Sequence, residues 1–178
     1  MWKLVSVGSL IFMVSSLGWA QNAHPVVEAH AVMATDAGHA DSSIKLAVIA
    51  QIAAGYHINA HKPTLDYLIP TELKLDPGPE FTVRNIVYPQ GTPKKFEFSD
   101  VPLSAYEGKV VVGARLQTGK TVPAGTYTAK AKFEYQACND HACLAPTSVP
   151  LSLTIRIVPP NVPLKPKESD VFHRLKLE

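Results

Sequence analysis

The sequence has 178 residues, 46% of them hydrophobic and 18% charged, which provides enough apolar material for one domain with a full core. This composition excludes a disordered chain, and the length is too short for two full domains. The formal net charge is only +2, and no basic cluster extends beyond Lys94-Lys95, which argues against nucleic acid as a partner.

Residues 1–20 have the pattern of a cleavable signal peptide. Lys3 gives a basic start, an apolar run extends from residue 4 to residue 17, and Ala20 ends a small-x-small cleavage site. The apolar run is shorter than the roughly 20 residues that a membrane-spanning helix needs. We therefore expect a periplasmic or secreted protein without a transmembrane segment in the mature chain, in a compartment where disulfides persist.

The rest of the sequence predicts β-strands and no long amphipathic helix. Residues 125–136 and 149–157 alternate apolar and polar side chains, as half-buried strands do, and Pro150 suits the start of a strand or an edge position. Further strand candidates are residues 26–32, 44–52, 71–75, 81–88 and 109–116. Turns rich in proline and glycine are expected at residues 77–79, 90–93, 100–102 and 123–125.

These strands predict an all-β fold, an immunoglobulin-like β-sandwich of about seven to nine strands that spans residues 21–158. Both tryptophans, Trp2 and Trp19, lie in the signal, so the core tryptophan of antibody-type domains is missing. Residues 159–178 are rich in proline and charged residues. We expect them to form an extended, loosely ordered tail.

The two cysteines form the main candidate site. Cys138 and Cys143 flank a four-residue segment, Asn-Asp-His-Ala, that is rich in turn formers and lies between two strand candidates, so both should lie at a hairpin. A disulfide that closes about six residues stabilises by only roughly 2 kcal/mol, against nearly 5 kcal/mol for a loop of about 100 residues. A redox role is therefore favoured, and a purely structural disulfide is the alternative.

The turn between the cysteines contributes two candidate modulators of a thiolate. His141 would favour the thiolate through partial positive charge, and Asp140 would oppose it. Simple solvation of the turn is the alternative for both residues.

Residues 135–146, Tyr-Gln-Ala-Cys-Asn-Asp-His-Ala-Cys-Leu-Ala-Pro, resemble the active-site hairpin of the family of N-terminal periplasmic domains of the thiol:disulfide interchange protein DsbD. Residues 54–58 resemble the Gly-Tyr strand of that family, and residues 95–98 resemble its cap loop. The resemblance implies that Cys138 and Cys143 pass reducing equivalents to thioredoxin-fold partners through a mixed disulfide, with a slight preference for Cys143 as the cysteine that forms it.

The same resemblance implies that a cap loop shields the cysteine pair between encounters. Phe98 is the first candidate for the capping aromatic, Phe96 is the neighbouring option, and Tyr56 is a candidate wall of the site. Ser99 and Asp100 stand where the family has Tyr-Gly.

The full-length family member continues into a membrane-embedded electron-transporting domain and a thioredoxin-like domain, and this sequence contains neither. We therefore expect a stand-alone component of a protein-disulfide reductase system, without a cofactor, which receives electrons from a separate membrane protein.

Two other functions remain open on the sequence. One is a non-catalytic binding sandwich that keeps a structural hairpin disulfide. The other is a copper or zinc module in which the cysteines join histidines. The histidines considered for it are His57 and His61, which are four residues apart, together with His141, His24, His30 and His39.

Overall fold

The protein is built almost entirely from antiparallel β-strands, as a computed structural model shows for residues 25–177. The signal peptide expected at residues 1–20 lies outside the described residues. The elements are β1 (Val27–Met33), β2 (Ser43–Ile52), β3 (His57–Asn59), β4 (Glu72–Asp76), β5 (Phe81–Val87), β6 (Thr92–Lys94), β7 (Leu103–Tyr106), β8 (Lys109–Thr118), β9 (Gly125–Tyr135), β10 (Ala137–Cys138), β11 (Thr147–Ile157) and the short helix α1 (Ser169–Phe172).

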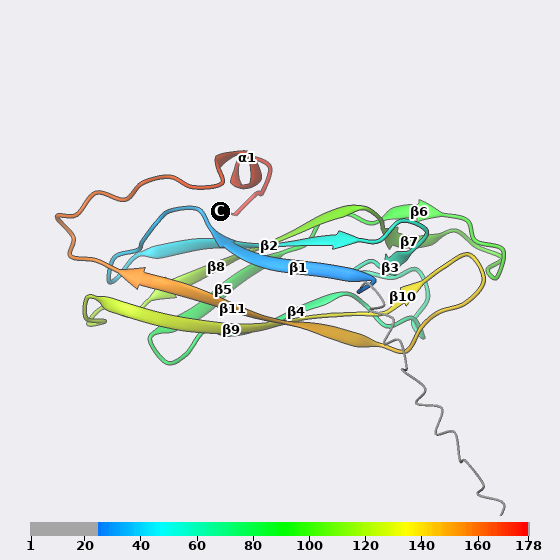
Figure 1. Cartoon of the computed structure of the whole chain (residues 1–178), viewed down its shortest axis with the longest axis horizontal. Helices are drawn as coiled ribbons and strands as arrows, with labels where there is room; N and C mark the ends of the chain where they lie inside the picture. The colour runs from blue at the N-terminus through cyan, green and yellow to red at the C-terminus, as the bar shows by residue number, and fades with distance from the viewer. Residues whose placement is uncertain (1–24, 178) are drawn as a thin grey trace, which may run out of the picture.

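Two sheets form the layers of a sandwich (Figure 1). One has the strand order β1-β2-β8-β5 and the other has the order β11-β9-β4. Their inner faces share one apolar core, in which Leu46 and Val112 come from the first sheet and Phe133 and Ile155 from the second. The predicted all-β sandwich is therefore confirmed.

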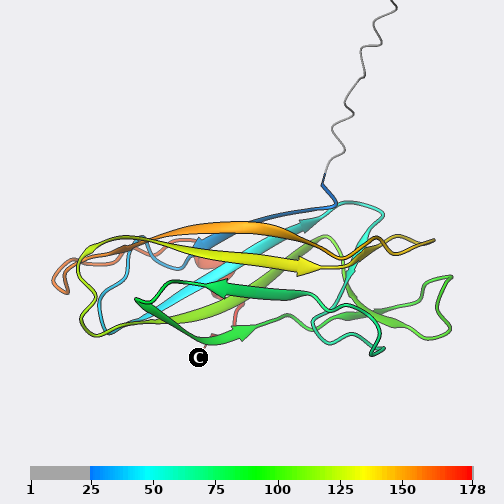
Figure 2. The same cartoon turned by 90° about the horizontal axis from the view of Figure 1, so that it is seen from below.

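A third sheet, with the order β10-β3-β7-β6, lies at one end of the sandwich. It forms because the chain leaves β9 at Gln136 and pairs with β3 instead of continuing along β11. The hairpin at residues 138–143 and the loop at residues 95–102 both project at this end (Figure 2).

The seven strands expected from the sequence are all present, and four short strands add to them. These are β3, β6, β7 and β10, which have only two to four residues each. Residues 90–93 were expected to form a turn, but β6 begins at Thr92. Pro150 lies within β11, which is an edge strand, so its missing N–H breaks no ladder inside the sheet.

The C-terminal residues pack on the sandwich, whereas the sequence had suggested a loosely ordered tail. Thr35 forms a β-bridge with Pro166, and the backbone N–H of Lys165 donates to Oδ1 of Asp36 at 2.9 Å. Leu177 is buried and lies over Gly113 of β8, where any Cβ would approach it within 3.1 Å. Because Gly113 has no side chain, the C-terminal residues have room to pack on the outer face of the sheet. Within residues 25–177, no helix has the length and apolar character needed to cross a membrane.

Candidate functional site: a disulfide hairpin beside an aromatic stack

Cys138 and Cys143 form a disulfide that closes the hairpin after β10. The two residues also form an isolated antiparallel bridge, with their Cα atoms 3.9 Å apart. Asn139 organises the turn between them, because its Oδ1 accepts the backbone N–H groups of His141 at 2.9 Å and Ala142 at 2.8 Å. An asparagine side chain therefore holds the turn in the way expected of an Asx turn.

The two cysteines differ sharply in exposure. Cys138 ends β10 and is only 1% exposed, whereas Cys143 belongs to the exposed part of the hairpin. Thiol–disulfide exchange requires an incoming sulfur to reach one sulfur of the disulfide in line with the other. Of the two cysteine residues, Cys143 is therefore the one exposed to solvent.

Polar side chains fix the base of the hairpin. Nδ2 of the buried Asn59 donates to Oε1 of Gln136 at 3.3 Å and to the carbonyl of Ile69 at 3.0 Å. Nε2 of Gln136 in turn donates to the carbonyl of Leu144, which follows Cys143, at 3.2 Å. The hairpin is thus tied to β3 at the point where the chain changes sheets.

Three aromatic rings stack beside this hairpin. The ring of His57 in β3 lies 3.8 Å from that of Phe96, with 17° between their planes, and Phe98 continues the stack 5.4 Å from Phe96. His57 is the residue opposite Cys138 in the pairing of β10 with β3. The stack therefore links the loop expected as a cap to β3, the strand that pairs with the buried cysteine's strand β10.

The cap loop is anchored by a small apolar cluster of its own. Phe96 is 3% exposed and packs with Leu68, Leu103 and Ala105, with Leu65 alongside. Phe98 is 42% exposed at the outer end of the ring stack. The structure thus places Phe96 inside the site and Phe98 on its surface.

Tyr56 lies next to His57 and lines a pocket of about 410 Å³ with it. Lys94, Glu107 and Asp140 contribute charged groups to the same pocket, and Lys94 forms an ion pair with Glu107. Asp140 of the hairpin turn thus lines the same pocket as His57 of β3. The side chain of His141, by contrast, is exposed at the turn.

His57 carries the main electrostatic feature of the site. Burial lowers the pKa of its imidazole from 6.5, Glu107 and Asp140 oppose that change, and Lys94 adds to it. Its Nε2 is buried, and no hydrogen-bond partner for it is found among the described residues. The sequence alone indicates His57 only as a candidate metal ligand, because its position opposite Cys138 depends on a strand pairing that residue spacing does not show.

The two histidines considered together as metal ligands have separate surroundings. His61 stacks on Tyr88 with the ring centroids 3.6 Å apart, and its Nδ1 lies 3.1 Å from the carbonyl oxygen of Thr71. His57 stacks on Phe96 instead. Within residues 25–177, no group of three or more His, Cys, Asp and Glu side chains is arranged to hold a metal ion. His24 lies outside that range.

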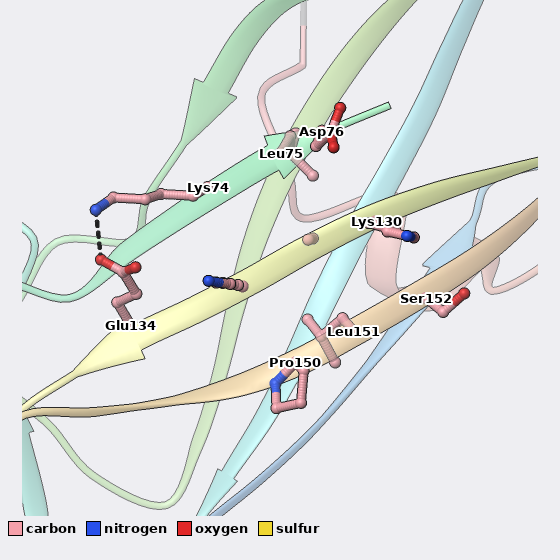
Figure 3. Close-up of a pocket in the computed structure, with 10 residues that line it drawn as sticks. Lys74, Leu75, Asp76, Lys130, Glu134, Pro150, Leu151 and Ser152 are labelled. Carbon is pink, nitrogen blue, oxygen red and sulfur yellow. Dashed lines mark ion pairs between the residues drawn. The ribbon is translucent and has the colours of Figure 1, made fainter. Parts of the chain in front are cut away.

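A separate groove lies on the sheet of β11, β9 and β4 (Figure 3). Lys74, Lys130, Glu134 and Leu151 are among the residues that line it, and Lys74 pairs with Glu134 at 2.6 Å. The described residues that line this groove include none from the hairpin or the cap loop. It is therefore distinct from the disulfide site.

Comparison with protein families gives one match over most of the chain. The family model described as "Thiol:disulfide interchange protein DsbD, N-terminal" matches residues 23–154. Comparison of the sequence with curated proteins gives no match.

Several solved structures have similar folds. The N-terminal periplasmic domain of ScsB from Proteus mirabilis has a TM-score of 0.51 and 15% identity, over 71% of this chain and 45% of that chain. The N-terminal domain of DsbD from Neisseria meningitidis, in the reduced form, has a TM-score of 0.43 and 19% identity, over 70% of this chain and 86% of that chain. A type I cohesin from Pseudobacteroides cellulosolvens has a TM-score of 0.43 and 11% identity, over 75% and 96% of the two chains. At this identity, the likeness to ScsB describes the fold alone.

Proposed function

Because this chain belongs to the family of N-terminal domains of the thiol:disulfide interchange protein DsbD, we propose that it is an exported thiol:disulfide interchange module. In this role, Cys138 and Cys143 carry reducing equivalents to thioredoxin-fold proteins of the periplasm. The observation that carries the proposal is the pairing of a buried Cys138 with an exposed Cys143 in one disulfide at a hairpin tip.

The exchange uses the two cysteines in different roles. In the reduced module, the Cys143 thiolate attacks the partner disulfide, and the displaced partner sulfur leaves with the electron pair. The Cys138 thiolate then attacks Sγ of Cys143, which forms the Cys138–Cys143 bond and releases the partner as a dithiol. Two electrons move to the partner in each cycle, and a separate membrane electron-transporting protein restores the dithiol.

The surface around the exposed cysteine suits a protein partner. Tyr67, Ile69, Phe98, Val101 and Leu144 are the large hydrophobic residues that stand exposed among residues 25–177. They belong to the hairpin, the cap loop and the loop that packs against the cap loop at residues 61–71. Exposed apolar side chains that gather on one surface mark a protein-binding site, and Leu144 of this set directly follows Cys143.

Trapping of the mixed disulfide tests the proposal directly. A Cys138→Ser variant, exported to the periplasm, keeps the attacking Cys143 but cannot resolve the mixed disulfide. It should therefore accumulate covalent adducts with thioredoxin-fold proteins, visible on non-reducing gels and identified by mass spectrometry. The Cys143→Ser variant is the matched control and should give far fewer adducts, and the double variant should give none.

The alternative is a binding sandwich with a structural disulfide, and the reduction potential separates the two functions. A structural disulfide of an exported protein has a potential below about −300 mV, whereas an exchange module has a less negative value. A potential below that limit, together with the absence of adducts from Cys138→Ser, would contradict the exchange function.

A further inference from the structure

Cys138 must exchange a proton in a position that water does not reach. Its side chain is 1% exposed, and it changes between thiol, thiolate and disulfide in each cycle of the function proposed above. Burial disfavours a thiolate that has no nearby group to accept or donate its proton. We propose that His57 is the proton acceptor and donor of Cys138, and that it relays the proton between the buried sulfur and the solvent.

The strand pairing places the two residues directly opposite each other. Cys138 of β10 and His57 of β3 are direct partners in an antiparallel ladder, next to the pair formed by Ala137 and Ile58. Directly opposed residues of such a ladder share one face of the sheet and have Cβ atoms about 4.5 to 5.5 Å apart. An imidazole extends far enough from its Cβ to reach a sulfur at that separation.

The imidazole of His57 is held in place, and one of its ring nitrogens has no hydrogen-bond partner among the described residues. Its ring is fixed against Phe96 by the stack at 3.8 Å, and its Nε2 is buried without a partner among the described residues in the disulfide form. A neutral imidazole has one N–H donor and one lone pair. Reduction of the disulfide adds an S–H group on the facing strand, which is the kind of partner that this ring lacks.

The charges around His57 suit a proton acceptor. The charged groups that act on it are Lys94 of β6, Glu107 after β7 and Asp140 of the hairpin turn. Burial is the largest influence and lowers the pKa of His57, which favours the neutral ring, the form whose lone pair can accept a proton. His57 also lines the pocket of about 410 Å³, which has room for several water molecules.

The proton and electron balance of the step is as follows. In the mixed disulfide, His57 takes the proton of the Cys138 thiol, and the resulting thiolate attacks Sγ of Cys143. The Cys138–Cys143 bond forms, the bond between Cys143 and the partner sulfur breaks, and the electron pair leaves on the partner sulfur. The His57 imidazolium then returns its proton to water in the pocket. In the reverse direction, the imidazolium protonates Cys138 as it leaves.

A two-step reaction with 5,5′-dithiobis(2-nitrobenzoate) isolates this transfer. The reduced protein releases one thiolate of the reagent when Cys143 forms a mixed disulfide, and releases the second when Cys138 attacks that disulfide. We compare wild type with His57→Phe, which keeps a ring to stack on Phe96 but has no ring nitrogen. His61→Phe is the matched control, because His61 is also stacked, on Tyr88, outside the hairpin.

In His57→Phe, the second release should slow by about 100-fold at neutral pH, within the range of general acid–base catalysis. Its rate should then follow the titration of a thiol alone between about pH 5 and pH 9, without the inflection that a histidine adds. The first release should change little, and His61→Phe should leave both steps unchanged. A folded His57→Phe protein with the wild-type second step and pH profile would overturn the proposal.

A second measurement does not depend on a variant at His57. The ring nitrogens of His57 are followed by NMR in the reduced protein across the same pH range, in wild type and in Cys138→Ser. The His57 titration should shift when the thiol is replaced, and an identical titration in both proteins would overturn the proposal. Loss of the proposed function has a different signature, because the reagent would still reveal both steps while Cys138→Ser trapped no thioredoxin-fold protein.

Discussion

Phe96 and Phe98 are two residues apart in one loop, and their rings stack at 5.4 Å with only 10° between the planes, yet Phe96 is buried and Phe98 is exposed. The inner ring is fixed by the apolar cluster around Leu68 and Leu103 and by the imidazole of His57. The outer ring is 42% exposed and lies 6.5 Å from the imidazole of His57. One loop thus provides both an anchor in the interior and an apolar side chain on the proposed docking surface.

This difference predicts separate effects of the two truncations. Phe96→Ala should lower the free energy of unfolding by about 3 to 5 kcal/mol, as expected for a buried phenylalanine. Phe98→Ala should change it by less than about 1 kcal/mol, since surface substitutions have small effects, but it should slow adduct formation with protein partners. Urea unfolding and the trapping assay measure the two effects. Equal destabilisation by both variants would contradict the assignment of anchor and surface ring.

The unequal burial of the cysteines predicts unequal reactivity in the reduced protein. Iodoacetamide should modify Cys143 first, because Cys138 is covered within β10, and mass spectrometry after short exposures should detect the singly labelled form. Unfolding in urea should make the two rates similar. Faster labelling of Cys138 in the folded protein would contradict the roles assigned to the two sulfurs.

Gly91 is a position where a single methyl group should matter. A Cβ there would overlap Oγ of Ser104 and lie 2.5 Å from Cβ of Ala60, so Gly91→Ala should displace the start of β6 and lower the urea midpoint. Gly125→Ala is the matched control, because its nearest neighbours lie at the ordinary distance of 3.7 Å. The control should shift stability by no more than about 0.5 kcal/mol, and a comparable loss in both variants would contradict this explanation.

Asp36 predicts a pH dependence for the attachment of the C-terminal residues. The hydrogen bond from the backbone N–H of Lys165 lowers the pKa of this carboxyl below 3.8, and the charges of Arg156, Lys165 and Lys167 act in the same direction. The folded state therefore favours the carboxylate, so this contribution is fully present above pH 3.8 and is lost as the pH falls through the lowered value.

Hydrogen exchange of residues 159–177 should report this attachment. Protection should fall in acid in the wild type, whereas Asp36→Asn should show weaker protection at neutral pH and less change on acidification. Asp66→Asn, at an exposed carboxyl in another loop, should behave like wild type. Identical protection in Asp36→Asn and wild type would show that this carboxylate does not hold the tail.

The long strands could be predicted because alternation is visible over seven or more residues, as in β9, where Ala129 and Phe133 face the core. The short strands could not. β3 and β6 have three residues each, and β6 contains Pro93, so neither shows a period and both depend on their neighbours for pairing. The packed tail was also missed, because its contacts depend on Gly113 and Leu177 meeting across the sheet.

For the candidate site, local sequence was enough to place the cysteines at a hairpin, whereas the loop with Phe96 and Phe98 was selected by the resemblance to the family. Local sequence did not distinguish which ring is buried, since both have the same residue type and lie two residues apart in one loop. Nor did it connect His57 with Cys138, because β10 has only two residues and its pairing with β3 arises where the chain leaves β9. Contacts of this kind come from topology rather than from local pattern.

Because the chain changes sheets at Gln136, the candidate site and the main hydrophobic core lie in different sheets of this small protein. The buried cysteine, its opposing histidine and the strands that bracket the cap loop all belong to β10-β3-β7-β6, while the main core lies between the two larger sheets. For protein engineering, the larger sheets are therefore the place to introduce stabilising substitutions without altering reactivity. The small sheet is the unit to transplant when a comparable sandwich is to be given the proposed exchange chemistry.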